Sequence, residues 1–277
     1  FVIIGKTTNT NNLTLKFNKK IVGEIPVEAL ASKAPIYDRK WIKKKPSKKK
    51  IELKNLKKIQ IEDALIKILS SPNHSNKSWV TDQYDQMVMC DTAQKSGSDA
   101  AIIRIHNKDK AIAVSVDSSA NYCKSYPLTG GKQIVCENWR NLISVGAKPL
   151  AITNCLNFGN PENKEIMGEF AECLEGVKEA CNFLNYPVVS GNVSFYNGTN
   201  KKNIYPTPVI GGVGLIKKLS NPLSHSFKRT NSNIILIGKT FGHIEQSCFL
   251  KENYSIIDGM PPEINLLNEK NNGESLL

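Results

Sequence analysis

The chain has 277 residues, of which 40% are hydrophobic and 22% charged, and its formal net charge is +12 at pH 7. This composition is typical of a globular protein with one large core or two smaller ones. It excludes a membrane-spanning protein, because no stretch approaches the roughly 20 consecutive apolar residues that a bilayer requires.

The positive charge is concentrated in one stretch. From Arg39 to Lys58, ten lysines and one arginine accompany a single acid, Glu52. Such a run is typical of a solvated linker, and it contains only one aromatic residue, Trp41, on which a base could stack. We therefore predict a basic linker and no nucleic-acid partner.

The seven cysteines form no Cys-x-x-Cys pair, and no histidine lies at ligand spacing from them. This pattern indicates free thiols in a reducing cytoplasm and argues against a zinc site. No secretory signal is visible at the start of the sequence.

The N-terminal part reads as short strands over residues 2–4, 13–17 and 21–25, with a turn at 10–12. After the lysine run, residues 61–69 have the apolar spacing of a short helix that packs on one face. Residues 100–105 and 110–116 are predicted to form a hairpin. The second hairpin strand ends on Asp117, whose carboxylate could bind a hard cation or cap the next turn.

Two longer helices follow, over residues 130–145 and 161–184, and Gly146 is expected to end the first. Gly130 and Gly131 would start that helix, where free amides could hold an anion or serve helix initiation alone. The acids of the second helix are expected to face water: Glu165, Glu169, Glu172, Glu175 and Glu179. Residues 233–240 are predicted to be a buried strand with a turn.

Strands and helices thus alternate, which predicts an α/β arrangement whose loops gather on one side of a sheet. The strand that begins at Val188 should neighbour the strand that ends at Asn154.

Small polar residues follow an apolar run in Val188–Asn197, which reads Val-Val-Ser-Gly-Asn-Val-Ser-Phe-Tyr-Asn. Backbone amides, an amide oxygen and hydroxyls could meet an ion or a phosphate there. The alternative is a tight turn in which Gly191 has a positive φ. A second such stretch, Ala151–Glu162, also ends an apolar run with Asn, Gly and Pro.

Together with Gly-Gly-Lys-Gln at 130–133 and Pro-Thr-Pro-Val-Ile-Gly-Gly-Val-Gly at 206–214, these motifs resemble one family. They are similar to the second half of the large subunit of phosphoribosylformylglycinamidine synthase, of the PurM-like ATP-binding superfamily. The resemblance covers the whole chain and is densest between Asp99 and Leu215. It implies a PurM-like N-terminal domain with helices packed on a β-sheet, followed by a truncated PurM C-terminal-like domain.

The resemblance also implies domain boundaries. Residues 1–38 would be the tail of a preceding PurM C-terminal-like domain, and residues 39–75 a basic linker with a short helix. Residues 76–219 would form the ATP-binding domain, and residues 220–277 would start a second C-terminal-like domain. Because the chain opens on Phe1 inside a predicted strand, we expect it to be a fragment.

The family joins nitrogen to formylglycinamide ribonucleotide, using ATP, Mg²⁺ and ammonia from glutamine. By resemblance, Asn192 would bind Mg²⁺, Asn154 and Gly191 would contact ATP, and Ser194 would contact the substrate. No catalytic residue is expected in this fragment, because the general acid/base histidine and the main magnesium ligands of the family lie in the first half. The implied partners are that missing first half, the glutaminase subunit and a small bridging subunit.

Two departures from the family pattern bear on phosphate binding. Glu245 stands where the family's Gly-x-Leu-Gly-x-Ser loop has a glycine, and its charge argues against phosphate binding by that loop. Residues 119–123, Ser-Ala-Asn-Tyr-Cys, lack the arginine that relatives have at this point.

Two alternatives remain open at the level of sequence. One is another ATP-dependent enzyme of the superfamily, similar to aminoimidazole ribonucleotide synthase. The other is a non-catalytic interaction module with a basic tether, which would bind nucleic acid in a salt-sensitive way.

Overall fold

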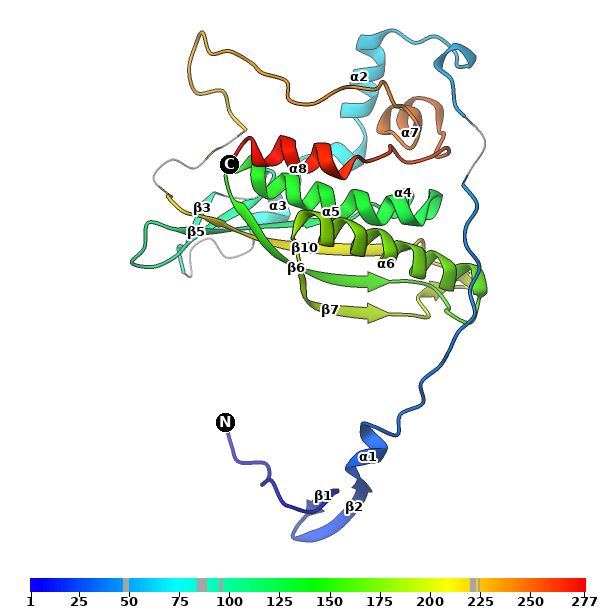
Figure 1. The fold of residues 1–277 in the computed structure, drawn as a ribbon, viewed down its shortest axis with the longest axis vertical. Coiled ribbons are helices and arrows are strands. Elements are labelled where there is room, and N and C mark those ends of the chain that lie inside the picture. The colour runs from blue at the N-terminus through cyan, green and yellow to red at the C-terminus, as the bar shows by residue number, and fades with distance from the viewer. Residues whose placement is uncertain (47–49, 84–88, 95–96, 220–222, 224) are drawn as a thin grey trace. The chain divides into compact units, whose positions relative to one another are not determined.

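The computed structural model describes residues 1–46, 50–83, 89–94, 97–219, 223 and 225–277. The chain divides into two compact units, residues 1–39 and 40–277 (Figure 1). The domain boundaries expected at 75/76 and 219/220 stay predictions. Residues 47–49 of the predicted lysine-rich linker lie outside the described residues.

The first unit is a β-hairpin with a short helix. Strand β1 (Asn12–Phe17) pairs antiparallel with β2 (Lys20–Pro26), and helix α1 (Val27–Leu30) follows. The two strands are confirmed, and the turn that joins them lies at Asn18 and Lys19, which have positive φ angles of 47° and 65°. The strand predicted over residues 2–4 is wrong, because this exposed segment has no neighbouring strand among the described residues.

The described part of the second unit is organised by a six-stranded sheet with the order β3-β4-β5-β10-β6-β7. The strands are β3 (Thr92–Gln94), β4 (Ala101–Arg104), β5 (Ala111–Asp117), β6 (Lys148–Asn157), β7 (Val188–Ser194) and β10 (Thr207–Ile216). Strands β6 and β7 run parallel, and the other neighbouring strands pair antiparallel. The predicted hairpin and the predicted neighbourhood of β6 and β7 are therefore confirmed. Strands β8 (Gly198–Thr199) and β9 (Lys202–Asn203) form a separate small hairpin.

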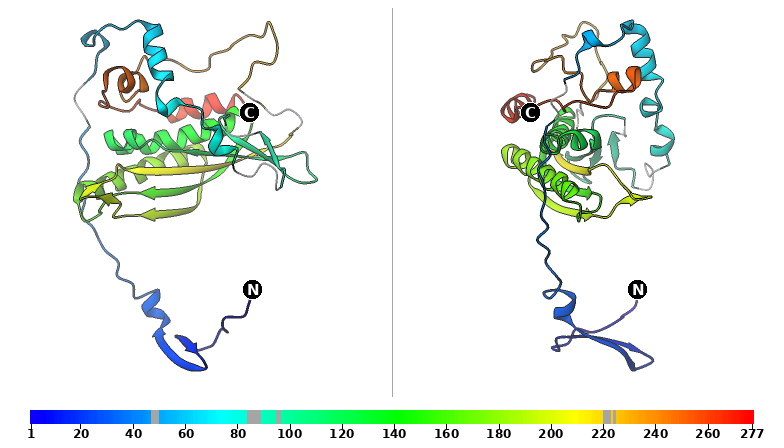
Figure 2. Two further views of the ribbon diagram at one scale, coloured as in Figure 1. Left: turned by 180° about the vertical axis from the view of Figure 1, so that it is seen from behind. Right: turned by 90° about the vertical axis from the view of Figure 1, so that its right-hand side faces the viewer.

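Helices cover one face of the sheet, and the other face is left open in the described structure (Figures 1 and 2). The covering helices are α5 (Pro127–Ser144) and α6 (Lys164–Leu184), with α8 (Leu266–Glu274) packed against both. The remaining helices are α2 (Ile61–Leu69), α3 (Ser78–Thr81), α4 (Ala120–Ser125) and α7 (Cys248–Tyr254), with 3-10 turns at Leu53–Asn55 and Pro72–His74. The expected packing of helices on a sheet is confirmed.

Helices α5 and α6 pack with their backbones in close approach. A Cβ at Gly131 would overlap the carbonyl oxygen of Cys173 in α6, and a Cβ at Gly176 would overlap the carbonyl oxygen of Leu128 in α5. Glycine is required at both positions because the other backbone occupies the place of a side chain.

The predicted start of α5 is wrong. The helix begins at Pro127, a residue suited to the first helical turn, and Gly130 N donates to Tyr126 O at 2.9 Å. Because that amide is already bonded inside the helix, the Gly-Gly pair offers no helix-start anion site. The end of the helix agrees with the prediction, since Gly146 has a φ of 79° directly after it.

Two acids of α6 do not face water as predicted. Glu169 and Glu172 are only 6% and 7% exposed. Glu169 Oε1 pairs with Lys124 Nζ at 2.7 Å, and Glu172 Oε2 accepts from Lys44 N at 2.8 Å. Lys44 therefore lies against α6, so this part of the basic stretch is docked rather than solvated. Burial of the acids is tolerated because each has a donor.

A buried polar contact joins the helix layer to the sheet. The fully buried Asn138 of α5 accepts from Tyr186 Oη through Oδ1 at 2.7 Å and donates to Ser115 O at 3.0 Å. Tyr186 precedes β7, and a Cβ at Gly212 in β10 would overlap both polar side chains. Because Gly212 has no side chain, the side chains of Tyr186 and Asn138 have room to contact each other beneath the sheet.

Two apolar segments remain exposed. Helix α2 is confirmed and packs against α7 with Ala64 buried, but four of its predicted apolar contact residues are 53–81% exposed: Ile61, Leu65, Ile66 and Leu69. The buried strand predicted at 233–240 is also wrong, because this exposed segment forms no strand. A strand needs a hydrogen-bonding neighbour, and the described residues supply none there.

No helix in the described parts is both long and apolar enough to cross a membrane.

We predict that Gly212→Ala destabilises the chain by about 2–4 kcal/mol, because the new methyl group must break the buried Asn138–Tyr186 contact or move β10. Urea unfolding followed by circular dichroism measures this change. Gly211→Ala is the matched control, because its Cβ would face the open side at 3.0 Å from Thr153 Cγ2. Its cost should stay below about 1 kcal/mol, and equal costs for the two variants would contradict the prediction.

Candidate functional site

The predicted site residues lie on the two parallel strands. In the register of β6 and β7, Asn154 is paired with Gly191, Cys155 with Asn192, and Asn157 with Ser194. On the other side of β6, Asn154 pairs with Ile210 of β10, which in turn pairs with Asp117 of β5. Segments that are almost 40 residues apart in sequence, such as Asn154 and Gly191, are therefore direct neighbours.

The alternation of side chains divides these residues between the two faces of the sheet. Asn154 and Gly191 share a row with Ile210, which is buried beneath the helices. Asn192 and Ser194 lie in the next rows on the open face, with Cys155 and Asn157 beside them. The structure thus brings the residues together in adjacent rows, but not all on one face of the sheet.

A glycine is required at position 191 because the side chain of Asn154 lies close to its backbone, and not because the chain turns there. It lies inside β7 and is absent from the glycines with positive φ in the described residues, so the tight-turn alternative is wrong. A Cβ at this position would overlap Asn154 Oδ1. The Asn154 amide therefore lies across the bare backbone of Gly191.

Asn192 is exposed and has a thiol as its neighbour. Its Nδ2 donates to Cys155 Sγ at 3.8 Å. Because the two polar atoms of an amide diverge from one carbon, this contact directs Oδ1 away from Cys155. The carbonyl oxygen is the atom that a hard cation would use.

Asp117 behaves as a structural carboxylate. Its Oδ2 accepts from Ser115 Oγ at 2.6 Å and Asn138 Nδ2 at 2.7 Å, and its Oδ1 accepts from Asn141 Nδ2 at 2.8 Å. Ser115 belongs to β5 and the two asparagines to α5, so the carboxylate joins the strand to the helix, and none of these donors is a backbone amide of the next turn. Among the described residues, no group of three or more His, Cys, Asp or Glu side chains could hold a metal ion.

Glu245 is also committed to structure. It is 8% exposed, and its two carboxylate oxygens accept from the backbone amides of Ile51 at 2.8 Å and Met260 at 2.7 Å. Its charge is therefore turned into the protein and joins two segments, instead of lying at the loop surface.

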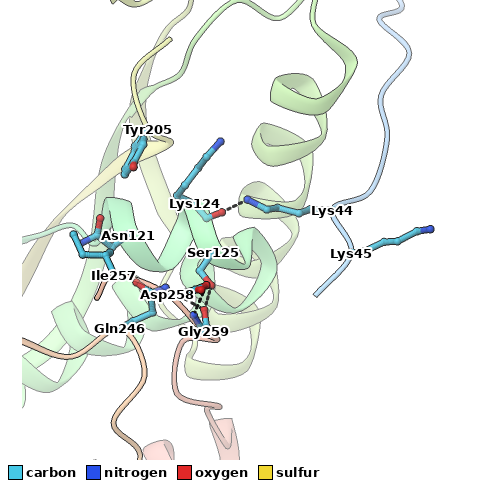
Figure 3. Close-up of a pocket in the computed structure, with 10 residues that line it drawn as sticks. All are labelled: Lys44, Lys45, Asn121, Lys124, Ser125, Tyr205, Gln246, Ile257, Asp258 and Gly259. Atoms are coloured by element: carbon cyan, nitrogen blue, oxygen red, sulfur yellow. Dashed lines mark hydrogen bonds between the residues drawn. The ribbon is translucent and has the colours of Figure 1, made fainter. Parts of the chain in front are cut away.

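A cavity of about 270 Å³ lies where α4 meets the C-terminal segment (Figure 3). Ser125 Oγ and Gln246 Nε2 both donate to Gly259 O in its wall. Lys44 directs its ammonium to Lys124 O, whereas Lys45 extends away from these groups (Figure 3). The cavity is lined by none of the four predicted site residues, so it does not identify their ligand.

The sequence did not single out the residue that holds Ser194 in place. Asn197 Nδ2 donates to Ser194 O at 2.9 Å, to Ser194 Oγ at 3.1 Å and to Phe158 O at 3.1 Å. The only sequence signal is an asparagine three residues after a serine beyond a strand, a spacing that is common in turns.

We predict that Gly191→Ala destabilises the chain by about 1–3 kcal/mol, because the methyl group displaces the Asn154 amide. In an Asn154→Ala background the same change should cost less, since the overlapping group is gone. A double-mutant cycle of unfolding free energies measures the coupling, which we expect to exceed about 0.5 kcal/mol. Additive effects would show that the two residues do not share this space.

We predict that the cysteines differ sharply in reactivity. Burial raises the pKa of the Cys136 thiol to about 12 and that of Cys181 to about 11. Because a raised pKa depletes the thiolate, only about one Cys136 in ten thousand is ionised at pH 8. Iodoacetamide followed by peptide mass spectrometry should label the exposed Cys155 and spare these two thiols in the folded chain. Labelling of Cys136 as fast as Cys155 would contradict this burial.

Comparisons with known proteins agree on one family. Residues 97–216 match the family model described as AIR synthase related protein, N-terminal domain. Phosphoribosylformylglycinamidine synthase subunit PurL of Pelagibacter ubique (strain HTCC1062) is 55% identical over 278 residues, covering 100% of this chain and 38% of the relative.

Solved structures of PurL from Thermotoga maritima are similar in fold as well as in sequence. The structure complexed with ATP is 32% identical, with a TM-score of 0.55, and the match covers 75% of this chain and 32% of that one. The structure complexed with FGAR is 32% identical, with a TM-score of 0.55, and covers 74% and 31%. The expected PurM-like fold class is confirmed, and the chain spans a little over a third of the curated relative's length.

Proposed function

We propose that the chain is part of a phosphoribosylformylglycinamidine synthase of the PurL family and forms one wall of its ATP-dependent active site. The whole protein would be a C–N ligase of purine biosynthesis that converts formylglycinamide ribonucleotide to the amidine. The PurL structures complexed with ATP and with FGAR support these two ligands.

One observation carries this proposal. The parallel pair β6 and β7 brings Asn154 next to Gly191 and Asn192 next to Cys155, with Ser194 two residues further along the same strand. A backbone without a Cβ, two amides and a hydroxyl thus lie within four rows of the sheet, divided between its two faces. These groups bind by hydrogen bonds and suit the positioning of a nucleotide and an uncharged amide, rather than nucleophilic attack.

Within this site, we assign Asn154 and Gly191 to ATP and Ser194 to the ribonucleotide substrate. The Asn154 amide occupies the space beside the bare backbone of Gly191, so this amide is the group in that row that could form a hydrogen bond with the nucleotide. Ser194 supplies a hydroxyl at the end of β7.

We assign Asn192 Oδ1 as a ligand of Mg²⁺. The exposed amide oxygen is a suitable ligand for a hard cation. In proteins, substrate phosphates and water commonly complete the coordination shell of Mg²⁺. When bound, Mg²⁺ would neutralise charge on the nucleotide phosphates. Because the described residues contain no cluster of metal-binding acids, the carboxylate ligands would come from the rest of the protein.

The open face of the sheet is the proposed contact surface for the missing first half of PurL. Where this face is formed by β4, β5 and β10, it carries four exposed apolar side chains: Ile103, Ile112, Val116 and Val213. Burial of such a surface is favourable. With the first half absent, we expect the isolated chain to be inactive, and synthase activity in these 277 residues alone would contradict the proposal.

The wider assignments follow from the same family. The glutaminase subunit and a small bridging subunit would complete the assembly and deliver ammonia. The seven free thiols support a reducing cytoplasm as the location.

We predict that full-length protein carrying this sequence binds the ATP analogue AMPPCP in a Mg²⁺-dependent manner and that Asn192→Ala weakens this binding at least tenfold. The expected reason is the loss of one metal ligand. Isothermal titration calorimetry with and without Mg²⁺ measures both effects.

Asn182→Ala, an exposed asparagine near the end of α6, is the matched control and should bind as the wild type does. Equal Mg²⁺-dependent affinities for the wild type and Asn192→Ala would remove Asn192 from the metal site.

A further inference from the structure

The segment after β7 is built around the side chain of Asn197. Its Nδ2 donates to Ser194 O at 2.9 Å, Ser194 Oγ at 3.1 Å and Phe158 O at 3.1 Å. Ser194 Oγ also lies 3.3 Å from Asn197 Oδ1, to which it can donate. Because Nδ2 has two hydrogens for these three acceptors, one hydrogen is shared, and one amide contacts both the backbone and the hydroxyl of Ser194.

This segment is anchored to the core of the molecule. Phe158 is 1% exposed, and its carbonyl accepts from Asn197 Nδ2 and from Asn197 N at 3.1 and 3.2 Å. Phe170 packs edge-on against both Phe158 and Phe195, with centroid distances of 5.1 and 4.9 Å. The anchor of Asn197 is therefore rigid, and the amide is fixed before any ligand arrives.

The backbone between the two residues is held in an unusual conformation. Tyr196 has a φ of 60°, in the left-handed region that bulky residues rarely adopt. Its amide donates to Gly159 O at 3.0 Å, and its hydroxyl donates to Glu162 Oε1 at 3.2 Å. Such strain persists only where the surroundings fix it, and here the fixed conformation returns Asn197 to Ser194.

We propose that Asn197 is a positioning residue for the synthase, which acts through Ser194 on the binding of the ribonucleotide substrate. This inference rests on the proposed function. While Nδ2 donates to Oγ, the hydroxyl keeps its own proton for an acceptor. Without substrate that acceptor is Asn197 Oδ1, and a substrate oxygen would replace it without a change of the serine rotamer.

The test uses full-length protein and steady-state kinetics with both substrates. Asn197→Ala should raise KM for formylglycinamide ribonucleotide about tenfold, which corresponds to about 1.4 kcal/mol. KM for ATP should change less than about twofold, because the contact is local to Ser194. Asn197→Asp, which keeps the size but loses the donor, should give the same pattern.

The decisive comparison is made in a Ser194→Ala background. If Asn197 acts through Ser194, adding Asn197→Ala there should have little further effect on KM. Asn182→Ala is the matched control, since it removes an exposed asparagine of α6 that is not part of this segment, and its kinetics should equal those of the wild type.

Each outcome separates the proposals. A wild-type protein without synthase activity would overturn the proposed function, and Ser194→Ala with unchanged KM would overturn the substrate contact. If Ser194→Ala raises KM, then unchanged KM in both Asn197 variants, full additivity, or equal increases for ATP and the ribonucleotide would overturn the positioning role. A lower unfolding temperature in the Asn197 variants with unchanged kinetics would assign the residue to structure alone.

Discussion

A buried amide, that of Asn138, is the interaction on which the arrangement of the second unit depends. Its donor groups reach Ser115 O and Asp117 in β5, and its oxygen accepts from Tyr186 just before β7. Strand β7 is at the edge of the sheet and has hydrogen-bonded strand contacts only with β6 among the described residues. The amide therefore gives the edge strand a second attachment, beneath β10, to the other side of the sheet.

This attachment is strong because it is buried. A polar group that loses its partner in the interior costs the full desolvation energy, so the network tolerates few alternative positions of β7. The residues proposed to bind ATP, Mg²⁺ and substrate all lie on β6 or β7. The position of the ligand-binding groups thus follows from a contact that touches none of the ligands.

Much of the fold could be predicted from the sequence, because local periodicity determines it. The hairpin of β4 and β5, the parallel neighbours β6 and β7 and the end of α5 at Gly146 follow from alternation, apolar runs and turn residues. The start of α5 could not be predicted, because the role of Gly130 and Gly131 is set by tertiary contacts with α4 and α6. Glu169 and Glu172 were misjudged for the same reason, since their cationic and amide partners come from distant segments.

The candidate site shows the same division. Asn154, Gly191, Asn192 and Ser194 came from motif resemblance, and the strand register explains why they are neighbours. The division of Gly191 and Asn192 between the two faces follows from strand alternation, whereas the pairing of Asn154 with Gly191 depends on how β6 and β7 align. Asn197 and Cys155 contact site residues through side-chain geometry that no spacing rule predicts.

The order of the strands has a consequence for biosynthesis. Strand β10 lies between β5 and β6, yet it is the last strand of this sheet in sequence, and Val114 pairs with Val213. A ribosome makes the N-terminal strands first, so β3–β5 and β6–β7 emerge as separate groups with unpaired edges. The sheet can close only after Ile216 has left the ribosome, and such long-range pairing is slow. The nascent chain therefore passes through a stage in which the edges of β5 and β6, later covered by β10, are unpaired.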